Sequence, residues 1–117
     1  GVGLKNYRIE VTKDKYAGKL SSIHPHQIHF EILSELGILG YLFFISFMLV
    51  NLYLSIKSYF KTKNYFVLSG SLYVMAALIP ILPSGSFFTS FSATFFWMNF
   101  ALMTSALNSY KKNRNNI

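Results

Sequence analysis

Two long runs without a charged residue constrain this chain more than any other feature. No Asp, Glu, Lys or Arg occurs from residue 36 to residue 56, a run of 21 residues, or from residue 64 to residue 110, a run of 47. About 20 helical residues cross the roughly 30 Å hydrocarbon core of a bilayer once. Backbone in lipid must be bonded within helices or closed barrels, and these runs are too long for barrel strands. The runs therefore predict an all-α membrane protein with three transmembrane helices.

The second run is interrupted near its middle by Pro80, Pro83 and Gly85. Pro and Gly are the strongest breakers of regular structure, so a turn is predicted there. The predicted order is an extracytoplasmic loop (1–24), an amphipathic helix (25–36), a transmembrane helix (37–56), a cytoplasmic loop (57–64), a transmembrane helix (65–82), an extracytoplasmic turn (83–86), a transmembrane helix (87–108) and a cytoplasmic tail (109–117). This layout is expected of the C-terminal fragment of a larger polytopic protein.

The basic residues predict which ends face the cytoplasm. The loop after the first span and the tail after the third contain no acid, and their basic residues are Lys57, Lys61, Lys63, Lys111, Lys112 and Arg114. Short basic loops stay on the cytoplasmic side of a membrane. Most of the net charge of +7 is thus explained by topology, and no nucleic-acid interface is predicted.

The extracytoplasmic lead-in brings three histidines, His24, His26 and His29, close to the first span. Ionisable side chains at a membrane are costly unless they have a function. A helix that continues straight from Pro25 into the span would put His26 on nearly the same face as Gly37 and Gly40. The two glycines would then let a neighbouring helix approach closely. The polar residues of this helix form a stripe expected to face solvent: Gln27, Glu31 and Glu35.

The spacing of His26-Gln27, nine residues, Gly37, two residues and Gly40 resembles the signature of the bacterial O-antigen ligase and O-antigen polymerase family. The glycine-containing opening at residues 1–7 also resembles the entry to that family's large periplasmic loop. The resemblance implies a multi-pass enzyme of the bacterial inner (cytoplasmic) membrane, active on its periplasmic side in lipopolysaccharide biosynthesis. The fragment would be inactive alone.

The reaction that the resemblance implies is transfer of a glycan from an undecaprenyl-diphosphate carrier to a hydroxyl of lipid A–core or of another carrier-linked glycan. No cofactor and no metal take part. His26 matches the family's histidine and would be the catalytic base, which suits an imidazole that titrates near neutral pH. The expected substrate-binding residues are Arg8, His24, Gln27 and His29, with arginine suited to the diphosphate. The expected partners are the glycan donor, the acceptor, membrane lipid and upstream helices of the same protein, and no nucleic acid.

Other interpretations of the histidines stay open. His24, His26 and His29 could bind a metal, but the chain has no cysteine to support such a site. A transporter or channel segment with a histidine proton or cation site is the main alternative function. It would require ionisable groups along a path across the membrane, whereas the predicted spans carry no charge. A non-catalytic assembly subunit, in which His26 is replaceable, is a third hypothesis.

Overall fold

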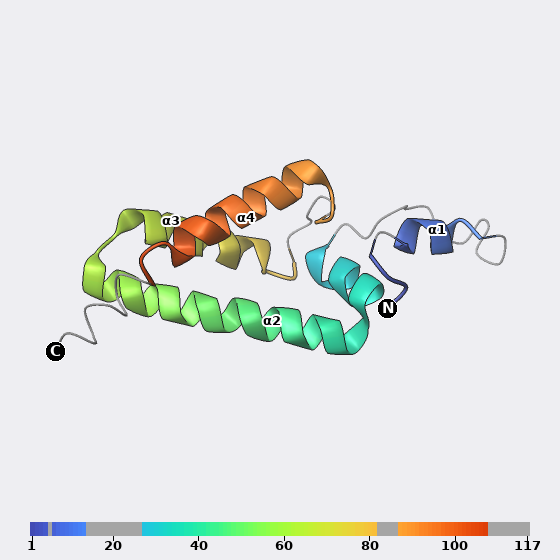
Figure 1. The fold of residues 1–117 in the computed structure, drawn as a ribbon, viewed down its shortest axis with the longest axis horizontal. Coiled ribbons are helices and arrows are strands. Elements are labelled where there is room, and N and C mark those ends of the chain that lie inside the picture. The colour runs from blue at the N-terminus through green and yellow to red at the C-terminus, as the bar shows by residue number, and fades with distance from the viewer. Residues whose placement is uncertain (5, 14–26, 82–86, 108–117) are drawn as a thin grey trace.

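The computed structural model describes residues 1–4, 6–13, 27–81 and 87–107, and within them every regular element is helical. These elements are α1 (Tyr7–Val11), α2 (Ile28–Thr62), α3 (Tyr65–Ala77) and α4 (Ser90–Thr104). Figure 1 shows α2 running along one side of the molecule, with α3 and α4 stacked beside it and α1 at one end. The all-α prediction is confirmed.

The longest helix, α2, is sharply bent at Gly37, whose backbone has φ 74° and ψ −179°. The bend divides α2 into a short arm (residues 28–36) and a long arm (residues 38–62). The short arm folds back toward α3 and α4, as Figure 1 shows in cyan against the green long arm. The straight helix expected from the sequence is therefore wrong, since the register across Gly37 is interrupted.

Local sequence explains the ends of α2 and α3. The side chain of Gln27 accepts the N–H of Phe30 at 3.1 Å and caps the start of α2. At the other end Lys63 adopts a left-handed conformation (φ 52°), and its N–H bonds to the carbonyl of Tyr59 at 2.7 Å. Asn64 Oδ1 then accepts the N–H of Phe66 at 3.0 Å and caps α3. Two helices thus join through one short, well-capped turn.

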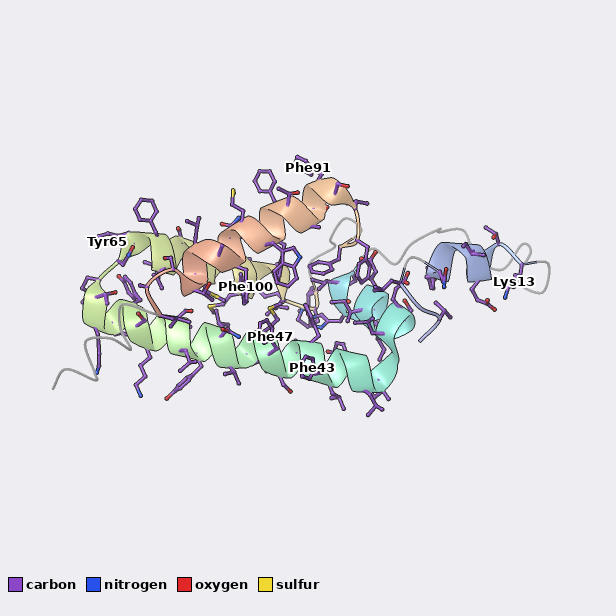
Figure 2. All side chains as sticks on the ribbon, in the orientation of Figure 1. Lys13, Phe43, Phe47, Tyr65, Phe91 and Phe100 are labelled. Carbon is purple, nitrogen blue, oxygen red and sulfur yellow. The ribbon has the colours of Figure 1, made fainter. Side chains whose placement is uncertain are left out.

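The core lies between the two arms of α2 and the other helices. It is built from Ile28 and Ile32 of the short arm, Met48 of the long arm, and Val74, Phe87, Phe96 and Met103. Helix α3 packs on both α2 and α4. Gly70 lets α3 and α4 approach closely, because a Cβ there would lie 2.5 Å from the carbonyl oxygen of Asn99. Figure 2 labels Phe47 of α2 and Phe100 of α4, whose rings stack with centroids 5.6 Å apart.

One helix of the described residues, α2, is long and apolar enough to cross a membrane. At about 1.5 Å per residue, the 13 residues of α3 and the 15 of α4 rise only about 20 and 22 Å, less than the roughly 30 Å core. The expectation of three spans is corrected to one. The difference arises because α3 ends at Ala77, before Pro80, and α4 starts only at Ser90.

Candidate functional site

The two glycines singled out in the sequence, Gly37 and Gly40, lie at the bend of α2. The conformation of Gly37 is essentially restricted to glycine. A Cβ at Gly40 would lie 2.5 Å from the Cβ of Leu36, because the bend turns the end of the short arm onto the start of the long arm. In this structure both glycines make the turn possible, and their helix-packing role stays a prediction.

The bend leaves backbone carbonyls at the end of the short arm without partners in the helix, and the N-terminal residues bond to them. The N–H of Val2 donates to the carbonyl of Ser34 at 2.8 Å, and that of Gly3 to the carbonyl of Glu35 at 2.9 Å. These bonds fix the N-terminal segment beside the bend. The bend and the N-terminal segment are consequently one structural unit.

Gln27 connects the start of α2 with the end of α3. Its Oε1 accepts the N–H of Phe30, and its Nε2 donates to the carbonyl of Pro80 at 3.0 Å. Because one partner is a donor and the other an acceptor, the orientation of the amide is determined. Gln27, the residue that follows His26, is thus held against the chain just after α3.

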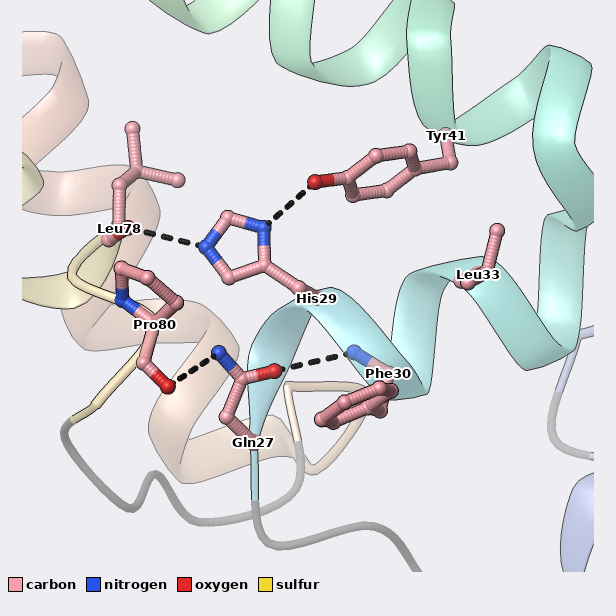
Figure 3. A pocket seen from close by; sticks show the side chains of 7 residues that line it. All are labelled: Gln27, His29, Phe30, Leu33, Tyr41, Leu78 and Pro80. Atoms are coloured by element: carbon pink, nitrogen blue, oxygen red, sulfur yellow. Dashed lines mark hydrogen bonds between the residues drawn. The ribbon is translucent and has the colours of Figure 1, made fainter.

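His29 lies two residues further along the chain, in the short arm, and makes two hydrogen bonds (Figure 3). Its Nε2 lies 2.9 Å from the carbonyl oxygen of Leu78, and its Nδ1 lies 3.0 Å from the hydroxyl of Tyr41. A carbonyl only accepts, so Nε2 carries a hydrogen, and in the neutral ring Nδ1 accepts from Tyr41. The side chain of His29 therefore ties together the short arm, the long arm and the end of α3.

A pocket of about 420 Å³ lies beside these residues. Figure 3 shows its lining, which is Gln27, His29, Phe30, Leu33, Tyr41, Leu78 and Pro80. The polar atoms of Gln27 and both nitrogens of His29 bond to other protein groups. The surface left for an occupant is accordingly mostly apolar.

Glu31 and Glu35, which the sequence places on a solvent-facing stripe, are instead buried, with 3% and 5% of their surface exposed. Glu35 accepts the backbone N–H groups of Asn6 at 3.1 Å and Tyr7 at 3.3 Å, at the start of α1. Glu31 accepts the N–H of Phe87 at 2.5 Å. Buried carboxylates are tolerated when they are hydrogen-bonded. The two acids thus hold two separate segments, the start of α1 and the residues before α4, against the short arm.

The remaining predicted site residues stay predictions. His24 and His26 lie outside the described residues. Arg8 belongs to α1, whose first turn is bonded to Glu35. In the described part of the chain no three His, Cys, Asp or Glu side chains gather as a metal site would require. The residue that sequence analysis missed is Tyr41, which looks like one more aromatic of an apolar run and gives no local signal of its bond to His29.

Comparison of the chain with models of protein families, with curated proteins and with solved structures finds no match. The resemblance to the O-antigen ligase and polymerase family thus stays a prediction, carried by the spacing of His26, Gln27, Gly37 and Gly40.

Proposed function

We propose that this chain contributes to a membrane glycosyltransferase of the O-antigen ligase or polymerase type. The observation that supports it is the arrangement of the motif residues: Gly37 and Gly40 form a bend, and the bend returns Gln27 to the end of α3 beside a pocket. Three residues of the spacing pattern, Gln27, Gly37 and Gly40, thus contribute to the bend and to its contact with the end of α3. His26 directly precedes Gln27 in the chain.

Residue exposure supports a membrane location. Large apolar side chains cover the outside of the helices: Leu39 is 81% exposed, Phe43 77% and Phe91 75%. In Figure 2 Phe91 points away from the bundle. Soluble proteins rarely expose contiguous apolar surface of this kind. We propose that the long arm of α2 crosses the inner membrane, that α3 and α4 lie beside it in the same bilayer, and that the bend faces the periplasm.

The proposed chemistry is a displacement at the anomeric carbon of the carrier-linked sugar. His26 accepts the proton of the acceptor hydroxyl as its oxygen forms the new glycosidic bond. The bond between the anomeric carbon and the diphosphate oxygen breaks, and the undecaprenyl diphosphate leaves with the electron pair. Arg8 and His24 are proposed to contact the donor. Gln27 and His29, whose polar atoms are bonded within the protein, are proposed to position the segment that carries His26.

The test is glycan transfer by the full-length protein that contains this chain, purified in detergent, with undecaprenyl-diphosphate-linked glycan and either lipid A–core or carrier-linked glycan as acceptor. His26→Ala is expected to lower transfer by about 10²–10⁴-fold, the usual contribution of a general base. A chelator is expected to leave native transfer unchanged. His24→Ala, which removes a proposed donor contact but not the base, is expected to lower transfer less than His26→Ala. Transfer by folded His26→Ala at the native rate would refute the mechanism, and the acceptor used would separate ligase from polymerase.

A further inference from the structure

The pocket beside His29 has a size and a lining that suit a small apolar ligand. Its volume of about 420 Å³ lies within the range of small-molecule sites in proteins, about 300–1,000 Å³. Most of its lining side chains carry no polar atom: Phe30, Leu33, Leu78 and Pro80. Phe30 and Leu33 are 65% and 36% exposed, so the pocket is open at the surface of the short arm. An apolar chain can therefore reach it from outside the bundle.

The polar side chains of the lining differ in the hydrogen bonds that they can still make. Both nitrogens of His29 and both polar atoms of Gln27 have partners in the protein. The carbonyl of Leu78 fixes the hydrogen of the neutral imidazole on Nε2, so the Tyr41 hydroxyl donates its own hydrogen to Nδ1 (Figure 3). The Tyr41 oxygen keeps the capacity to accept, and no other described residue donates to it. A ligand group that meets this oxygen must therefore be a hydrogen-bond donor.

We propose that the pocket binds a long-chain alcohol, whose chain lies against Phe30 and Leu33 and whose hydroxyl donates to the oxygen of Tyr41. A hydroxyl supplies the hydrogen that Tyr41 requires and brings no charge into the apolar lining. An ammonium group would also donate, but the described lining includes no carboxylate to neutralise it, and an unpaired charge in apolar surroundings is costly. An ether or a ketone of the same chain would face the Tyr41 oxygen with no hydrogen between the two acceptors.

The position of Tyr41 along α2 suits such an amphiphile. Tyr41 lies at the start of the long arm, about 6 Å along the helix axis from the bend at Gly37. In the proposed membrane orientation this is the boundary between hydrocarbon and water, where tyrosine is favoured and where the polar end of an alcohol lies. Leu39, next to it in the chain, is 81% exposed, as expected of a surface that faces lipid. The inference rests on the proposed membrane crossing of α2 and not on glycan transfer.

The test is photo-crosslinking of the full-length protein that contains this chain, in detergent, with a decanol that carries a diazirine in its chain. The matched probe is the methyl ether of the same molecule, which has no hydrogen to donate. Labelled residues are mapped by mass spectrometry, and labelling at the pocket is divided by labelling beside Phe43, which is 77% exposed. This ratio corrects for unequal partition of the probes into detergent. The native pocket should prefer the alcohol roughly 2- to 12-fold, the range that one hydrogen bond provides.

Three variants separate the hydroxyl contact from the shape of the pocket. Tyr41→Phe should lower labelling by the alcohol to the level of the ether and leave labelling by the ether unchanged, whereas a distorted pocket would change both. Tyr53→Phe is the matched control and should keep the preference, because Tyr53 lies on the same helix, is 63% exposed and does not line the pocket. Leu33→Trp should largely abolish pocket labelling by both probes, because the larger side chain fills the pocket.

Several results would overturn the proposal. Equal labelling of the native pocket by the two probes, or no labelling there by either, would do so, as would a Tyr41→Phe variant that still prefers the alcohol. Labelling that persists in folded Leu33→Trp would place the probe outside the pocket and would also overturn it. His26→Ala should keep the native preference even where it lowers glycan transfer, so alcohol binding and glycan transfer can fail separately.

Discussion

Replacing Glu35 by Ala is expected to release the N-terminal segment from the short arm of α2. The Glu35 carboxylate is 5% exposed and accepts two backbone N–H groups, those of Asn6 at 3.1 Å and Tyr7 at 3.3 Å. A hydrogen bond to a charged group contributes about 1.5–3 kcal/mol. The longer of the two bonds contributes less, and the bonds of Val2 and Gly3 to the short arm remain in the variant. We expect the free energy of local opening to fall by about 2–3 kcal/mol.

The assay is hydrogen–deuterium exchange followed by mass spectrometry on the protein in detergent. A loss of about 2–3 kcal/mol corresponds to roughly 30- to 150-fold faster exchange of the amides of α1, since about 1.4 kcal/mol is a factor of ten. Exchange in α3 should stay unchanged. The matched control is Glu10→Ala, which removes a carboxylate of the same segment that pairs with Lys13 on the surface. Such pairs contribute about 0–1 kcal/mol. Unchanged exchange in α1 of Glu35→Ala, or an equal effect of Glu10→Ala, would refute this role.

Three further substitutions test the bend and the packing around it. Gly37→Ala should lower the free energy of unfolding by about 1–3 kcal/mol, because only glycine adopts its backbone conformation readily, and denaturation in detergent should show less effect for the exposed neighbour Ile38→Ala. Gly70→Ala should lower the free energy of unfolding by about 1–3 kcal/mol, because the added methyl group would push α3 away from α4. An unaltered melting temperature would contradict the close packing of these two helices. A double-mutant cycle of His29→Phe and Tyr41→Phe should give a coupling of about 0.5–1.5 kcal/mol, and additive effects would mean that their bond does not stabilise the protein.

The helical content was predictable because it depends on local composition. Each of α2, α3 and α4 lies largely within a run without charged residues, and such runs favour helix in lipid. The number of crossings was not predictable from the same runs. The length of a run without charged residues limits how long a membrane helix can be, but other residues determine where the helix ends. Helix α3, for example, ends at Ala77, shortly before Pro80.

The bend at Gly37 could not be predicted from helical periodicity, which assumes an uninterrupted helix. Its conformation is favoured by partners distant in sequence: Val2 and Gly3 bond to the carbonyls that the bend exposes. Burial of Glu35 is missed for the same reason, since its partners are backbone amides 28 and 29 positions away. A pattern of carboxylates on one helix face does not show which amides will reach them.

The candidate site was partly predictable. Gln27 and His29 were singled out because polar residues beside a membrane-length run are unusual, and both line the pocket. Their hydrogen-bond partners could not be predicted, since these are the carbonyls of Leu78 and Pro80 and the hydroxyl of Tyr41. Backbone carbonyls have no sequence signature, so only the fold reveals them.

The most direct test of the bend, on which the candidate site depends, is the distance between its two arms. The chain has no cysteine, so spin labels can be attached specifically to Phe30→Cys on the short arm and Leu49→Cys on the long arm, both exposed in the structure. A straight helix would separate these positions by about 28 Å along its axis. The bend predicts a pulsed electron-resonance distance distribution centred well below that value, because Ile28 and Met48 belong to one core cluster. A distribution centred at about 28 Å or more would show that α2 is straight, and that Gln27 and His29 do not meet the end of α3.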